Sequence, residues 1–224
     1  YLIEDKYLFL SSIVTNLYTT TGIVILGALS TKVEVGYYGA AQKIIELAKN
    51  VVAMPIYQVV FPILARKFGE SQIIGVEAVK KILPIFNIIT LIVLCGLILT
   101  GYFLISILFG NEFLDSYKIL VILSFGLAAV FYGILIGGQV MLNIGLDKDF
   151  VKIQLIVSIL SVSASLIILP FGGAVTIALI WTLSEIIITA YQIFILKRKG
   201  VSVFDFNQLK IQSIKNAFKY MVAK

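Results

Sequence analysis

Six long apolar segments, each of about twenty residues or more, follow one another through this sequence with only short polar stretches between them. An α-helix needs about 20 apolar residues to cross the hydrocarbon core of a bilayer, whereas barrel strands alternate over about ten. Only 13% of the 224 residues are charged, against roughly 25% in a soluble domain. The sequence therefore predicts an all-α membrane protein with a six-transmembrane-helix bundle. The segments are about 7–29, 36–65, 82–109, 119–142, 151–169 and 174–196.

Loop charges predict the orientation of these spans, because loops rich in lysine and arginine stay in the cytoplasm. One set of loops carries Lys6, Arg66, Lys67, Lys80, Lys81, Lys148, Lys152, Lys197, Arg198 and Lys199. The other set carries Lys32 and Lys118 together with Glu34, Glu112 and Asp115. We expect the first set, and both ends of the sequence, in the cytoplasm. Residues 1–196 would form the bundle, and 197–224 a basic amphipathic tail lying on membrane lipids, with a frayed soluble tail as the alternative.

Two connections between segments carry structural signals of their own. Residues 66–81 are polar, but Ile73, Val76 and Val79 recur at helical spacing, which predicts a short interfacial helix. The pair Gly172 and Gly173, between the fifth and sixth segments, predicts a tight external turn.

Three charged residues, Lys43, Glu46 and Lys49, interrupt the second apolar segment. A charge at the bilayer centre costs at least about 2.5–3.5 kcal/mol, so three on one helix favour a polar cavity over lipid. Lys43, Glu46 and Asn50 lie about one helical turn apart and share a face, and Lys49 lies beside it. One interpretation is an ion pair between Lys43 and Glu46 near a membrane surface. The other is a transport path whose excess positive charge suits an anionic group.

Isolated polar residues in other segments are further candidates for such a path. Asn16 and Thr20 belong to a polar stripe in the first segment, and Gln139 follows the small residues of the fourth. These groups either line a path or join helices by hydrogen bonds. Glu185 lies well inside the sixth segment, where a lone carboxylate is typical of a proton or cation site. The alternative is a protonated side chain bonded to Ser184 or a neighbouring helix.

Prolines and small residues in the apolar segments predict how the helices bend and pack. Pro55 and Pro62 each remove a backbone donor, which predicts a kink in the second span. Ala129, Gly133 and Gly137 recur at intervals of four, which predicts a small-residue seam for close helix packing.

This sequence lacks the residues that are typical of enzyme active sites and metal sites. Histidine is absent, and the single cysteine, Cys95, lies in an apolar run and is expected in the core. A disulfide within the sequence is excluded, and a zinc or haem site is not expected. No paired carboxylates or glycine-rich phosphate loop stand out. We expect no enzymatic activity, no cofactor, no metal and no nucleic-acid partner.

Several runs resemble those of O-antigen-type polysaccharide repeat-unit flippases, members of the multidrug/oligosaccharidyl-lipid/polysaccharide exporter superfamily. The runs are residues 35–44 (VGYYGAAQKI), 60–66 (VFPILAR) and 108–113 (LFGNEF), with residues 11–27 around Asn16 and Tyr18. Family members have about twelve to fourteen spans in two bundles, so the resemblance implies the second, carboxy-terminal half of a two-bundle transporter. The sequence opens at Tyr1, directly before an apolar segment, which agrees with a piece of a longer protein.

The resemblance also implies a function. Flippases of this kind move undecaprenyl-pyrophosphate-linked oligosaccharide from the cytoplasmic to the outer leaflet of the cell membrane, by alternating access. Lys43 and Lys49 would attract the pyrophosphate or an acidic sugar, and Glu46 would hold their geometry. Glu185 would couple to H⁺ or Na⁺, and polysaccharide polymerase and glycosyltransferases would be partners.

Two other functions remain open from the sequence. A small-molecule exporter of the same superfamily would favour an acidic, aromatic-lined pocket, whereas the charges counted here are net positive. A membrane enzyme acting on the same lipid-linked sugars would need a catalytic group in a long external loop, and these loops are short.

Overall fold

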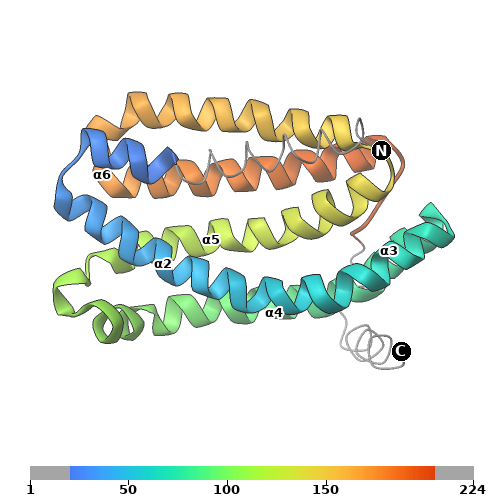
Figure 1. Ribbon diagram of the computed structural model, residues 1–224, viewed down its shortest axis with the longest axis horizontal. Coiled ribbons are helices and arrows are strands. Elements are labelled where there is room, and N and C mark those ends of the chain that lie inside the picture. The colour runs from blue at the N-terminus through green and yellow to red at the C-terminus, as the bar shows by residue number, and fades with distance from the viewer. Residues whose placement is uncertain (1–20, 205–224) are drawn as a thin grey trace.

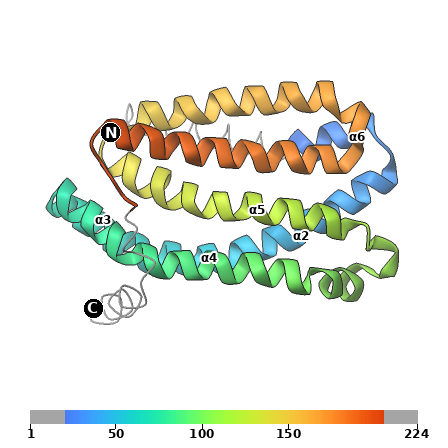
Figure 2. The same cartoon turned by 180° about the vertical axis from the view of Figure 1, so that it is seen from behind.

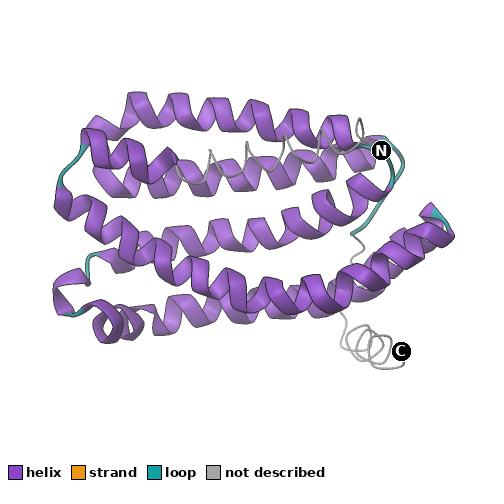
Figure 3. Cartoon of the chain, in the orientation of Figure 1, coloured by secondary structure: helices purple, strands orange, loops and turns teal. Residues whose placement is uncertain are grey.

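The computed structural model describes residues 21–204, and all the regular structure in that range is helical (Figure 3). The prediction of an all-α protein is therefore confirmed for this part of the chain. Residues 21–29 are helical. The elements that follow are α2 (Lys32–Pro55), η1 (Ile56–Val60), α3 (Phe61–Glu70), α4 (Gln72–Phe109), η2 (Asn111–Phe113), α5 (Ser116–Leu135), η3 (Ile136–Met141) and α6 (Asp147–Arg198).

Five stretches of the described chain are long and apolar enough to cross a membrane. They are Lys32–Glu70, Gln72–Phe109, Ser116–Met141, Asp147–Leu169 and Phe171–Arg198, and they coincide with the second to sixth apolar segments. The expected first span, 7–29, lies largely outside the described residues. The expected tail beyond residue 204 lies outside them as well. The count of six spans and the two-bundle arrangement therefore stay predictions.

Helix α5 occupies the centre of the bundle (Figures 1 and 2). It contacts α2, α4 and α6, and side chains along its whole length, such as Leu120, Leu127 and Phe131, are fully buried. A hydrogen bond also joins α5 to α4, because the Tyr132 hydroxyl donates to Asn87 Oδ1 at 2.7 Å. Because α5 is central, it forms part of the wall of a cavity inside the bundle.

Helix α6 is broken at Gly173, where φ is +57° and ψ is −144°. Its two arms then run side by side in opposite directions (Figure 1). This conformation favours glycine, so the predicted tight turn is confirmed, and its place on the external side stays a prediction. The Glu34 carboxylate of α2 accepts a hydrogen bond from the Ala174 backbone N–H at 2.7 Å, which satisfies a donor at the start of the second arm.

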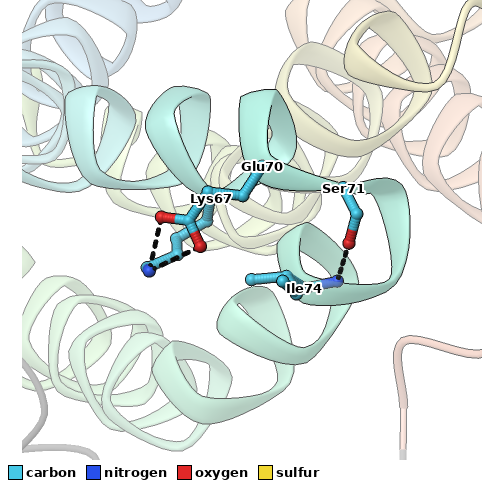
Figure 4. Close-up of polar contacts among 4 residues, drawn as sticks. All are labelled: Lys67, Glu70, Ser71 and Ile74. Atoms are coloured by element: carbon cyan, nitrogen blue, oxygen red, sulfur yellow. Dashed lines mark hydrogen bonds and ion pairs between the residues drawn. The ribbon is translucent and has the colours of Figure 1, made fainter.

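The prediction of a separate short interfacial helix within residues 66–81 is wrong. Helix α3 ends at Glu70 and α4 begins at Gln72, so Ser71 alone separates them. Its backbone is extended, and its hydroxyl caps α4 by accepting from the Ile74 N–H at 3.2 Å, while Lys67 pairs with Glu70 at 2.7 Å (Figure 4). The 38 residues of α4 extend over roughly 57 Å. The hairpin therefore projects beyond the bundle (Figure 1).

Two turns of wider, π-helical geometry interrupt the long helices. At η1 the Phe61 N–H bonds to the Ile56 carbonyl, and the helix continues past both prolines of the second span. At η3 the Leu142 N–H bonds to the Gly137 carbonyl. Such turns shift the side chains that follow relative to those before and are frequent at functional sites.

Cysteine labelling from outside the cell checks the orientation. The single native cysteine, Cys95, was expected in the core but is exposed on α4, so the test needs a Cys95→Ala background. Glu112→Cys and Gly69→Cys both place the thiol on exposed positions, one at each end of the bundle. An impermeant maleimide is expected to label Glu112→Cys and to spare Gly69→Cys until the cells are opened. The reverse pattern would contradict the orientation.

Candidate functional site

A cavity of about 570 Å³ lies between α2, α5 and both arms of α6. Its walls combine apolar and aromatic side chains with an unusual number of polar ones for a membrane bundle. The polar side chains are Gln42, Glu46, Lys49, Asn50, Gln139, Gln154, Glu185 and Gln192. Polar groups inside a membrane are costly and usually face a bundle interior or a water-filled path.

On α2, one helical face supplies half of these groups. Tyr38 and Ile45, which line the cavity from the same face, are buried. The same rotation of α2 turns Glu46, Lys49 and Asn50 towards the cavity, as their spacing of three and four residues allows.

Lys43, predicted to lie on the same path, does not line the cavity. Its side chain is 64% exposed and its ammonium lies 3.6 Å from Glu46 Oε2. The ion pair of the alternative interpretation is therefore present, and it joins a residue outside the cavity to one that lines it. A pair this exposed stabilises the helix little.

On the second arm of α6, Trp181, Glu185 and Gln192 line the cavity from successive turns. An adjacent face of the arm is fixed to α5, because the Thr182 hydroxyl donates to the Ile122 carbonyl and the Thr189 hydroxyl to the Ala129 carbonyl, both at 2.9 Å. These two bonds set the rotation of the arm. The Glu185 carboxylate thus faces the α2 wall, where the Lys49 ammonium acts on it electrostatically.

The small-residue seam predicted on the fourth segment is confirmed as the contact between α5 and α6. A Cβ added at Gly133 would lie 3.1 Å from Thr189 Oγ1, and one added at Gly137 would lie 2.6 Å from Phe150 Cε2. Only glycine lets the helices approach this closely. Gln192 packs against the same seam.

Gln192 is the most deeply buried polar group of the cavity wall, with 1% of its surface exposed. Its Oε1 has no hydrogen-bond partner among the described residues. Neither Gln192 nor Gln154 was predicted to belong to the site. The signal was available, because each is a lone amide inside an otherwise apolar stretch, and a buried amide is costly unless it is bonded.

Formal charges in the described cavity wall are two carboxylates, Glu46 and Glu185, against one ammonium, Lys49. The expected excess of positive charge is therefore not found in this part of the cavity. That expectation counted Lys43, whose side chain lies outside.

The remaining predicted path residues divide into two groups. Gln139 lines the cavity beside the wider turn η3, and its Nε2 donates to the Gly138 carbonyl at 3.2 Å. Asn16 and Thr20 lie outside the described residues.

Comparison with known proteins matches residues 5–118 to the sequence model of a family described as polysaccharide biosynthesis protein. A curated relative from Escherichia coli (strain K12), named putative O-antigen transporter, is 27% identical over 183 residues. Another from Staphylococcus aureus, named capsular polysaccharide biosynthesis protein CapF, is also 27% identical over 183 residues. These alignments cover 79% and 80% of this chain but 43% and 45% of the relatives. The chain thus spans about half the length of these relatives.

Proposed function

The chain belongs to the polysaccharide biosynthesis protein family and is a multi-pass membrane protein, and we propose that it forms the carboxy-terminal half of a flippase for lipid-linked oligosaccharide. The substrate would be an undecaprenyl-pyrophosphate-linked repeat unit, carried from the cytoplasmic to the outer leaflet. The names of both relatives, a transporter and a capsule biosynthesis protein, agree with this class of cargo.

The observation that carries the proposal is the polar cavity inside an apolar bundle. Eight polar side chains from α2, both arms of α6 and the wide turn η3 converge on it, although each of these spans otherwise suits a membrane. A path of this kind lets a hydrophilic head group cross while its lipid tail stays in the bilayer. Alternating access would expose the cavity first to one side and then to the other.

Individual roles follow from position. Lys49 faces the cavity and would attract the pyrophosphate, while Lys43 would act from outside the wall through its pair with Glu46. Glu185 would take up the coupling ion, H⁺ or Na⁺. Asn50 and Gln139 would bond sugar hydroxyls, as would Asn16 and Thr20 if the first span reaches the same path.

A small-molecule exporter of the same superfamily is the second candidate, and one observation favours it. The described wall carries more acidic than basic groups, and aromatic residues such as Tyr38 and Trp181 line it. An organic cation would suit such a wall. The names of the relatives favour the glycan.

Transport by the full-length protein in vesicles tests the proposal. A fluorescent undecaprenyl-pyrophosphate-linked oligosaccharide is placed in the leaflet that corresponds to the cytoplasm, and an impermeant quencher reports its arrival in the other leaflet. We expect the quenched fraction to rise with protein content, and to rise faster under a proton or sodium gradient if transport is coupled.

The matched control replaces the lipid with ethidium in the same vesicles. Lipid movement without dye accumulation supports the flippase. Dye accumulation without lipid movement would favour the small-molecule exporter, and movement of neither would contradict both transport functions.

A further inference from the structure

We infer that the cavity recognises an uncharged sugar residue of the cargo through a belt of side-chain amides, in which Gln192 determines specificity. The amide belt comprises Gln42, Asn50, Gln139, Gln154 and Gln192. The inference rests on the proposed function, since it names the part of the substrate that this half of the transporter holds.

The composition of the wall is the first argument. Each side-chain amide offers both donors and an acceptor, so it matches a sugar hydroxyl or acetamido group in either direction. The five amides come from α2, η3 and both arms of α6, and thus surround the cavity instead of lying along one helix. A belt made only to neutralise charge would need lysine and arginine in those positions.

Charge is the second argument. An acidic sugar entering the cavity would meet Glu46 and Glu185, with Lys49 as the one ammonium of the described wall. Like charges at close range in a weakly polar site repel each other strongly, which selects against a uronic acid. A neutral sugar meets no such repulsion, and it does not compete with the pyrophosphate for the Lys49 ammonium.

The unpaired carbonyl of Gln192 is the third argument and identifies the position that discriminates. Its Oε1 is buried, lacks a partner among the described residues and belongs to a side chain that lines the cavity. A buried acceptor without a partner is costly, and a sugar hydroxyl would remove that cost on binding. Trp181, about three turns away on the same arm, offers a flat apolar surface for the C–H face of another sugar ring of the cargo.

The size of the cavity agrees with a cargo of this kind. About 570 Å³ falls within the range of about 300–1,000 Å³ that holds small organic ligands. The cavity therefore has room for a sugar residue, while the lipid tail stays outside.

The experiment compares two lipid-linked disaccharides that differ only in the distal sugar, glucose in one and glucuronic acid in the other. The full-length protein in vesicles is expected to move the glucose lipid at least several-fold faster. Gln192→Leu is expected to slow the glucose lipid about three- to tenfold, which is the loss of one hydrogen bond. Its thermal unfolding temperature is expected to be equal or higher, because leucine removes the unpaired carbonyl.

Thr189→Val is the matched control, since Thr189 is buried on the same arm and bonds to α5 outside the cavity. It is expected to lower the unfolding temperature and to leave the preference for glucose unchanged. Equal rates for the two lipids in the wild type would overturn the inference. So would a Gln192→Leu variant that loses stability but keeps its rate, because that pattern marks a structural residue.

Failure of the proposed function gives a different result. If the wild type moves neither lipid, the proposed flippase function is contradicted. Sugar binding is then tested separately by the fluorescence of Trp181. Trp181 is the single tryptophan of this sequence, and Trp181→Phe supplies the blank. Fluorescence change with methyl glucoside but not with glucuronate supports the amide belt, and no difference between the two sugars overturns it.

Discussion

Reversing the charge of Lys49 to glutamate is expected to reduce transport about 100-fold or more, a loss of about 2.7 kcal/mol in favourable interaction. The variant places a third carboxylate in a wall that already holds Glu46 and Glu185, and removes the ammonium of that wall. A pyrophosphate would then meet repulsion from every charged group that the described cavity presents. Initial transport rates at equal protein levels measure the effect.

Lys43→Glu is the matched control, because it makes the same charge change on the same helix outside the cavity. It is expected to lower transport less than Lys49→Glu does, because Lys43 acts only through its exposed pair with Glu46. Equal losses for Lys43→Glu and Lys49→Glu would show that the cavity wall is not the part of α2 that matters.

The spans could be predicted from the sequence, whereas the ends of the helices could not. Apolar composition reports the hydrocarbon core, so the third segment was expected from residue 82, but α4 begins at Gln72. Polar residues such as Lys80 and Lys81 continue a helix as well as apolar ones do. The break in α6 was predictable for a different reason, since Gly173 adopts a conformation that other residues rarely take.

The site was predictable only as far as a single helix can reveal it. Spacing placed Lys43, Glu46 and Asn50 on one face, but a shift of one position decides which lysine faces inwards. In the folded bundle the buried residues Tyr38 and Ile45 lie on the cavity side of α2, and this rotation of the helix brings Lys49 to the wall. The intervals of four predicted the seam of small residues, but they do not identify Gln192, from a distant segment, as a residue that packs against it.

Replacing Gly126 with valine is expected to lower stability by about 1–3 kcal/mol, which corresponds to an unfolding temperature lower by several degrees. A Cβ at this position would lie 2.8 Å from Trp181 Cε3 and 3.0 Å from Thr182 Oγ1. Valine therefore forces the second arm of α6 away from α5 and strains the bond from Thr182 to the Ile122 carbonyl. Thermal unfolding of the purified protein in detergent measures the change.

Gly96→Val is the matched control, because a Cβ at Gly96 of α4 meets no atom within 4 Å in the described structure. It makes the same change within a membrane helix and is expected to cost little. Trp181→Leu removes the ring that valine strikes, so the double variant is expected to be more stable than Gly126→Val alone. A loss that persists in the double variant would place its origin in the backbone of α5. Recovery would identify the Gly126–Trp181 contact as the point where helix packing and the cavity wall depend on each other.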